Sequence, residues 1–196
     1  DALIRIGNLA SHRDEAYKDV IDDLQKQHHQ IIKDLLPVEK HEESLETCDS
    51  LFNSLRSIAQ GVYLLGELSP TSLDAIQGFG EQWSSRIIAT KLASIGIATK
   101  WVDSRKIIRT ISKGEKTAVD VQKTYSRVNE MIESNPITQL FVMPGFIASD
   151  KQGRTTTLGR GGSDYSASLM AVGCKARALE IWTDVPGMMT SNPKVV

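Results

Sequence analysis

Apolar residues recur every three to four positions in the first third of the chain, which is the spacing of one face of an α-helix. From Ala16 this spacing predicts a long amphipathic helix, and Pro37 ends it because proline lacks the N–H that an interior turn needs. The apolar positions of this helix are Tyr17, Val20, Ile21, Leu24, Ile31, Ile32 and Leu35. A short charged loop follows, so we expect the next helix to pack antiparallel against this one.

The second helical pattern ends at Gly66, and its apolar positions are Leu45, Cys48, Leu51, Phe52, Leu55, Ile58, Ala59, Val62 and Leu65. All four histidines of the chain lie in this helical part: His12, His28, His29 and His41. Metal ligation is one use for them. We expect solvated helix faces instead, because no cysteine or pair of carboxylates accompanies them.

A third helix is predicted to begin at Ser69-Pro70, because serine caps helix starts and proline fits the first helical position. Its inward positions would be Leu73, Ile76, Trp83, Ile87, Ile88 and Leu92. Gly78-Phe79-Gly80-Glu81 lies near the middle, and each interior glycine costs roughly 1 kcal/mol relative to alanine. Either another group approaches the backbone there or the helix is broken.

Strands and helices alternate in the rest of the chain. Strands are predicted over residues 97–102, 106–111, 139–143 and 178–182, and helices over residues 119–132 and 163–172. Residues 146–148 and 154–157 flank a polar turn that suits a hairpin. This alternation predicts an α/β fold with a mostly parallel sheet covered by helices.

The composition narrows the class of protein. The chain has 196 residues, of which 40% are hydrophobic, and a formal net charge of −1. These values indicate one globular domain and argue against a disordered chain or a dedicated nucleic-acid binder. No apolar stretch approaches the ~20 residues of a membrane-spanning helix. Cys48 and Cys174 are too few for a disulfide framework or a zinc site, so we expect a cytoplasmic protein.

The ends of the sequence suggest a piece of a longer protein. The chain starts at Asp1 without an initiator methionine and stops at Val196 directly after a predicted turn. We therefore expect truncation at both ends. Within the chain, we divide residues 1–68, the helical part, from residues 69–196, the α/β part.

The densest candidate site is Gly159-Arg160-Gly161-Gly162-Ser163-Asp164, which leads into a predicted helix. Glycines allow close approach to the backbone, and the first N–H groups of a helix attract an anion. Arg160 can hold a carboxylate or phosphate through two parallel hydrogen bonds. Asp164 either caps the helix or organises cationic groups around a phosphate. Taken alone, a glycine-rich connection with a capped helix explains the segment equally well.

Standard phosphate motifs do not fit this segment. The pattern GxxxxGK[ST] is absent, and the dinucleotide fingerprint GxGxxG fails because Asp164 stands at its last glycine position. Two further candidates are weaker. Glu81 could receive an ammonium group, although a surface glutamate is commoner. Thr183 and Asp184 follow the predicted strand 178–182, where open α/β sheets bind ligands, unless an ordinary turn ends that strand.

Four segments together resemble, in order and spacing, the catalytic domain of aspartate kinases: residues 79–81, 144–146, 153–165 and 181–187. The resemblance implies the amino-acid kinase fold, a three-layer α/β/α sandwich with a mainly parallel sheet. It also implies ATP-dependent phosphorylation of the side-chain carboxylate of L-aspartate to 4-phospho-L-aspartate, the first step of lysine, threonine and methionine synthesis. The parent protein would be an aspartate kinase, alone or fused to homoserine dehydrogenase.

The resemblance also implies site roles. The matched substrate-binding positions are Glu81, Phe146, Arg160, Gly161, Gly162 and Ser163, with Glu81 at the amino group and Arg160 on a carboxylate. Arg160 and Asp164 are the matched catalytic positions, with Asp164 organising the catalytic lysines. Thr183, Asp184, Met189 and Lys194 match nucleotide contacts, and Mg²⁺ would arrive with ATP. No position matches a separate metal site. The full-length protein is expected to be a homo-oligomer with neither nucleic-acid nor membrane partners.

Some parts of the family pattern differ or are missing. Gly78 replaces a usual serine and Gln82-Trp83 a usual Arg-Leu, while Met189 and Asn192 replace a frequent tyrosine and aspartate. The Lys-Phe-Gly-Gly-Thr-Ser strand with its catalytic lysine is expected before the start of this chain. The second lysine-bearing loop and the regulatory domains are expected after its end. We therefore expect this chain to be inactive alone.

Three alternatives stay open. A kinase of another small acid, such as glutamate or N-acetylglutamate, would have the same fold, although residues 154–164 favour aspartate. A non-catalytic fragment that assembles or regulates an enzyme is the second alternative. A nicotinamide oxidoreductase is the third, and Asp164 in place of the third glycine speaks against it.

Overall fold

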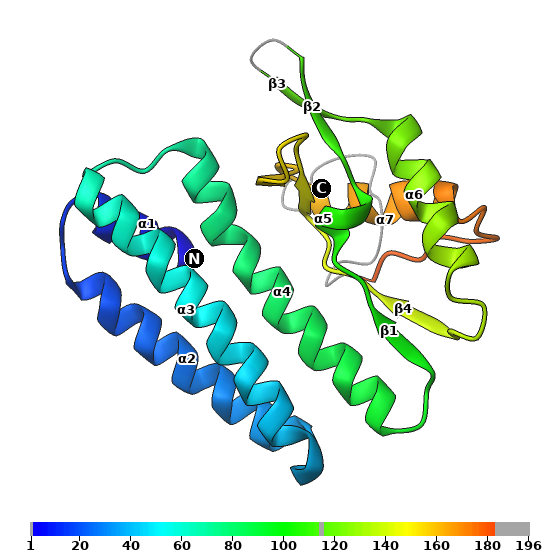
Figure 1. Cartoon of the computed structure of the whole chain (residues 1–196), viewed down its shortest axis with the longest axis horizontal. Helices are drawn as coiled ribbons and strands as arrows, with labels where there is room; N and C mark the ends of the chain where they lie inside the picture. The colour runs from blue at the N-terminus through cyan, green and yellow to red at the C-terminus, as the bar shows by residue number, and fades with distance from the viewer. Residues whose placement is uncertain (1, 114–115, 183–196) are drawn as a thin grey trace, which may run out of the picture.

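The computed structural model describes residues 2–113 and 116–182. Four helices form one side of the molecule (Figure 1): α1 (Ala2–Ser11), α2 (Ala16–Leu35), α3 (His41–Leu65) and α4 (Pro70–Ser94), with the short helix η1 (Val38–Lys40) between α2 and α3. The other side holds β1 (Thr99–Trp101), α5 (Ser104–Ile107), β2 (Thr110–Lys113), β3 (Lys116–Val119), α6 (Val121–Glu133), β4 (Leu140–Val142), β5 (Ile147–Ser149), β6 (Thr155–Thr157) and α7 (Gly162–Gly173). In the described residues, no helix is long and apolar enough to cross a membrane.

The helical side has one continuous apolar core. As predicted, α2 and α3 pack side by side in opposite directions (Figure 1), and Gly66 ends α3 with a left-handed φ of 70°. The core takes residues from all four helices, including Ile6, Ala10, Ile21, Ile32, Phe52, Leu55, Ile76, Phe79 and Trp83. Trp83 of α4 stacks on Phe52 of α3, with ring centroids 4.1 Å apart and an angle of 18° between the rings.

Helix α4 is unbroken and packs on two sides. Its start follows the prediction, since the Ser69 side chain accepts a hydrogen bond from the Ser72 N–H. Gly78 faces the β5–β6 hairpin so closely that an added Cβ would lie 3.1 Å from Thr155 Cγ2 and 3.4 Å from Ile147 Cγ2. Of the two explanations for this glycine, close approach is therefore confirmed and a helix break is wrong.

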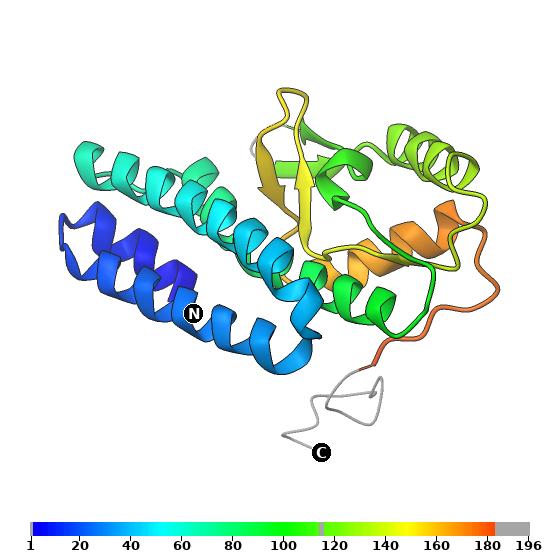
Figure 2. The ribbon, with the colours of Figure 1, turned by 60° about the horizontal axis from the view of Figure 1, so that its bottom comes forward.

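The α/β side contains three strand pairs. Strands β1 and β4 pair in parallel, and Arg109 forms a further parallel bridge with Ser149. The hairpins β2–β3 and β5–β6 are antiparallel, the second as predicted. Figure 2 shows α7 beneath the β5–β6 hairpin, and buried Ala148 and Leu169 share a small core there.

Of the strands predicted over residues 106–111 and 178–182, the first is right only at residues 110 and 111, which belong to β2, and the second is wrong. Residues 106 and 107 belong to α5, because the Asp103 side chain accepts a hydrogen bond from the Arg105 N–H and starts a helical turn. Residues 178–182 form no strand in the described structure, and Trp182 is 87% exposed. An apolar run becomes a buried strand only when a neighbouring backbone hydrogen-bonds to it, and no described strand does so here.

Smaller differences concern the helices. Helix α1 was not predicted, and the helix predicted from residue 119 begins at Val121 because Val119 pairs in β3. Ile88, predicted inward on α4, is 51% exposed. It lies on the part of the helix surface that neither the helical core nor the hairpin covers.

The histidines do not form a common site, and the described residues contain no group of three or more His, Cys, Asp or Glu that could hold a metal ion. The prediction of a solvated face is wrong for His28, whose ring lies 4.7 Å from Trp83 and 5.5 Å from Phe52 between centroids. Burial lowers the pKa of His28. His29 lies 2.6 Å from an Asp49 carboxylate oxygen.

The close approach at Gly78 predicts a stability effect. Gly78→Val would push two methyl groups into Thr155 and Ile147, and overpacking of this kind costs about 1–3 kcal/mol. Gly61→Val on α3 is the matched control, because a Cβ there meets nothing within 4 Å. Chemical denaturation should show a lower free energy of unfolding for Gly78→Val alone. Equal effects of the two substitutions would contradict the packing of α4 on the hairpin.

Candidate functional site

The loop Gly145-Phe146 and the start of α7 are packed against each other. A Cβ added at Gly162 would lie 2.9 Å from Phe146 Cδ2, and one added at Gly145 would lie 3.2 Å from Ser163 Cα. Gly161, directly before α7, has a left-handed φ of 73°. The structure therefore brings together four of the predicted substrate-binding residues: Phe146, Gly161, Gly162 and Ser163.

Ser166 fixes the backbone of Phe146. The Phe146 N–H donates to Ser166 Oγ at 3.0 Å, and this buried hydroxyl donates to the Gly162 carbonyl oxygen at 2.8 Å. Phe146 has a φ of 66°, which residues other than glycine rarely adopt. The bonds hold this conformation in place. Sequence reasoning missed Ser166, whose only signal is its position one helical turn after Gly162.

The start of α7 offers free backbone donors. Gly162 N–H donates to the Gly159 carbonyl and Tyr165 N–H to the Gly161 carbonyl, whereas the N–H groups of Ser163 and Asp164 find no acceptor among the described residues. The positive end of the helix dipole adds to their attraction for an anion.

Arg160 and Asp164 flank this turn with exposed side chains. In the described structure the Asp164 carboxylate accepts no hydrogen bond. Of the two roles considered for Asp164, it therefore does not perform helix capping. The Arg160 side chain likewise has no hydrogen-bond or ion-pair partner among the described residues, so it can meet an anion at the start of α7. The described geometry fits a carboxylate or phosphate at this point.

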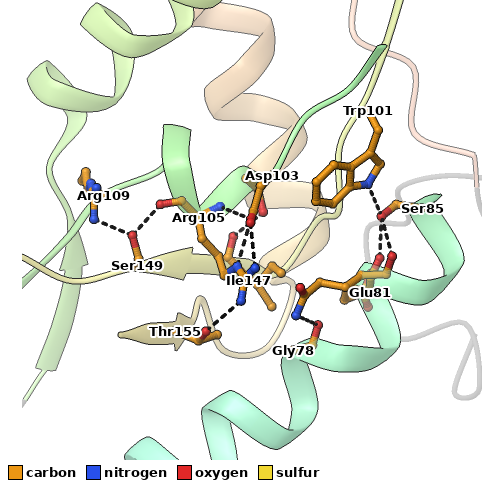
Figure 3. A network of polar contacts seen from close by, with 12 residues as sticks. Gly78, Glu81, Ser85, Trp101, Asp103, Arg105, Arg109, Ile147, Ser149 and Thr155 are labelled. Atoms are coloured by element: carbon orange, nitrogen blue, oxygen red, sulfur yellow. Dashed lines mark hydrogen bonds and ion pairs between the residues drawn. The ribbon is translucent and has the colours of Figure 1, made fainter. Parts of the chain in front are cut away.

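Glu81 occupies the adjoining surface of α4. It lies one helical turn after Gly78, whose backbone faces Ile147, the residue that follows Phe146. The side chain is half-buried, and burial raises the pKa of Glu81. Ser85 Oγ donates to the Glu81 carbonyl oxygen at 2.6 Å and accepts from Trp101 Nε1 at 2.9 Å (Figure 3), which ties β1 to this turn of α4.

A polar network that sequence reasoning did not find supports the β5–β6 hairpin (Figure 3). Buried Asp103 accepts two hydrogen bonds from the Arg105 guanidinium, at 2.7 and 2.9 Å. Although burial acts to raise the pKa of Asp103, the hydrogen bonds and charge of Arg105 lower it below its usual value. Ser149 Oγ donates to the Arg105 carbonyl oxygen and accepts from Arg109 Nη1. The sequence signal for this network was Asp103, which stands two residues before a basic residue at the start of a helix.

A second link joins the hairpin to α4. The Asp74 carboxylate accepts hydrogen bonds from Thr157 N–H at 3.2 Å and Thr157 Oγ1 at 2.7 Å. Thr157 ends β6, three residues before Arg160. The predicted nucleotide contacts Thr183, Asp184, Met189 and Lys194 lie outside the described residues.

Comparison with known proteins decides the family. The sequence profile of the amino acid kinase family matches residues 3–196. The chain belongs to this family. The predicted family and fold class are therefore confirmed.

Relatives within the family include bifunctional aspartokinase/homoserine dehydrogenase 2 of Arabidopsis thaliana, 29% identical over all of this chain and 21% of the relative. Lysine-sensitive aspartokinase 3 of Escherichia coli is 34% identical over 77% of this chain and 33% of the relative. A crystal structure of E. coli aspartokinase III in complex with aspartate and ADP (R-state) has a TM-score of 0.83 and 28% identity, covering 100% of this chain and 43% of that one. The amino acid kinase chain thus spans less than half of these relatives.

The role of Ser166 predicts a loss of stability. Ser166→Ala leaves the Phe146 N–H without its acceptor, and an unsatisfied buried donor costs about 1–3 kcal/mol. Ser168→Ala on the same helix is the control, because within the described residues Ser168 Oγ donates only to the Asp164 carbonyl oxygen of its own helix. Thermal unfolding should show a melting temperature several degrees lower for Ser166→Ala than for Ser168→Ala. Indistinguishable melting temperatures would show that Ser166 does not hold the loop.

The raised pKa of Glu81 predicts that replacing this residue increases the stability of the folded state, by an amount that depends on pH. At low pH the carboxyl is protonated in both states. As the pH rises through the unfolded and then the folded pKa, ionisation favours the unfolded state, so native Glu81 lowers stability at pH 7. Glu81→Gln should therefore raise the melting temperature at pH 7, by about 1–3 °C because the side chain is only half-buried, and the gain should shrink towards pH 4. Glu46→Gln on the exposed face of α3 is the control for removing a carboxylate charge, and a destabilised Glu81→Gln at pH 7 would refute the expectation.

Proposed function

We propose that this chain is part of the catalytic domain of an aspartate kinase, which transfers the γ-phosphoryl group of ATP to the side-chain carboxylate of L-aspartate. The observation that carries the proposal is the similarity of the entire chain to an aspartokinase solved with aspartate and ADP. Because the chain spans less than half of that relative, catalysis would belong to the full-length protein.

The described residues support a site for an amino acid with a carboxylate. Arg160 and the free N–H groups at the start of α7 supply positive charge and donors for one carboxylate. Glu81 is a half-buried carboxylate on the adjoining helix, and an arriving ammonium group would offset the desolvation that raises its pKa. Phe146, locked against Gly162, would form an apolar wall of the pocket.

In this reaction the protein itself takes part in little covalent chemistry. The acceptor is already a carboxylate, so no general base is needed. Catalysis would come from alignment and from neutralising charge on the transferred phosphoryl group. In the proposal Asp164, exposed and without a hydrogen bond in the described structure, organises lysines around the phosphates.

The proposal also covers the nucleotide contacts, the metal ion and the oligomeric state of the full-length protein. Thr183, Asp184, Met189 and Lys194 would contact ATP, and Mg²⁺ would arrive with the nucleotide and neutralise phosphate charge. The product, 4-phospho-L-aspartate, would feed lysine, threonine and methionine synthesis, and the full-length protein would be a homo-oligomer. Light scattering of that protein would test the last point.

Trapping of the product with hydroxylamine tests the function, because acyl phosphates form hydroxamates. The assay is run with ATP and Mg²⁺ on this chain and on the natural full-length protein, with aspartate, glutamate or N-acetylglutamate. We expect hydroxamate from the full-length protein with aspartate alone. Product with another acid only would overturn the substrate while leaving the family intact. No product with any acid would overturn the kinase function.

Arg160 should matter for the substrate. Arg160→Gln in the full-length protein removes two charged hydrogen bonds, so kcat/KM for aspartate should fall about 10- to 100-fold. Arg154→Gln is the control, because Arg154 pairs with Asp150 at the tip of the hairpin, at 2.7 Å. Steady-state kinetics at varied aspartate gives the comparison. An unchanged kcat/KM in Arg160→Gln would remove Arg160 from the substrate site.

A further inference from the structure

A cavity of about 140 Å³ lies among α2, α3, α4 and β1, and Phe146 is not among its lining residues. Ile32, Leu51 and Ile87 supply apolar walls, and Cys48, Trp83, Arg86 and Trp101 are also among its lining residues. We call it the Arg86 cavity. None of its lining residues belongs to the proposed substrate or nucleotide positions.

Two residues that line the cavity each carry a buried nitrogen without an acceptor among the described residues. In the described part of the chain, four buried side-chain nitrogen or oxygen atoms lack a hydrogen-bond partner, and two of them are Trp83 Nε1 and Arg86 Nε. Trp83 is only 2% exposed, so water reaches its indole poorly. Buried polar groups are normally hydrogen-bonded. Both nitrogens are shielded from a molecule the size of water, so the outer nitrogens of Arg86 are the donors that a molecule in the cavity would meet.

Arg86 also brings positive charge to the cavity. Its guanidinium carbon lies over the Trp101 ring, 3.5 Å from the ring centre, as in a cation–π contact. Burial lowers the pKa of Arg86, yet arginine stays charged at neutral pH. Among the described residues it forms no ion pair, whereas Glu43, the acidic residue of the lining, lies 3.2 Å from Lys40.

We propose that the Arg86 cavity binds a small carboxylate with an apolar, ring-sized body. The carboxylate pairs with the outer nitrogens of the Arg86 guanidinium, and the body packs on Ile32, Leu51 and Ile87. The volume sets the size, since an apolar cavity of about 150 Å³ accommodates benzene. A nucleotide is too large for this space.

Benzoate is the probe, and the test does not depend on kinase activity. Trp83 and Trp101 line the cavity, so the 196-residue chain carrying Trp182→Phe reports binding through these two indoles alone. We expect a saturable change in tryptophan fluorescence and a rising melting temperature as benzoate is added. Benzyl alcohol, of similar size but uncharged, should bind at least 10-fold more weakly.

Variants locate the site. Arg86→Met should weaken benzoate binding at least 10-fold, and Cys48→Met should abolish it by filling the cavity while leaving Arg86 in place. Arg160→Met should leave benzoate binding unchanged, because Arg160 belongs to the separate site at α7. The absence of a saturable change, equal binding of benzyl alcohol, or a loss in Arg160→Met instead of Arg86→Met would each overturn the proposal. Circular dichroism confirms that each variant is folded.

Discussion

Helix α4 must fit two packing surfaces at once, and the rest of the molecule is arranged around that requirement. One side of the helix gives Ile76, Phe79 and Trp83 to the core of the helical part. The other meets the β5–β6 hairpin through Gly78, where an added side chain would collide with Thr155. Because protein interiors are close-packed, this contact fixes where the hairpin and Glu81 lie.

The site at α7 also depends on close packing between two elements, on a smaller scale. Phe146 adopts a left-handed backbone that costs free energy, and Ser166 together with the missing side chains of Gly145 and Gly162 makes the conformation possible. Strain of this kind persists only when surrounding contacts hold it. The contacts around Phe146 keep the apolar wall and the helix N-terminus in one fixed relation.

The sequence predicted the elements whose causes are local. The helical spacing from Ala16 and the Ser69-Pro70 start gave α2 and α4, and the polar turn 149–153 gave the β5–β6 hairpin. The glycine-rich motif led to the turn before α7. Prediction failed for features that depend on contacts between residues far apart in the sequence. Residues 178–182 have strand-like composition but no described strand to pair with, and the Asp103 network and the Arg86 cavity exist only through the packing of several elements.

The packing of α4 against both parts of the molecule also determines how the molecule can unfold. Residues 1–68 differ in composition from the remainder, yet Trp83 and Ile76 complete their core from α4. Separating α1–α3 from α4 would expose these side chains to water, and shifting α4 would break the bonds from Thr157 to Asp74. Local opening of either part therefore raises the free energy of the other, and backbone amides on both sides should exchange with solvent through one shared cooperative unit.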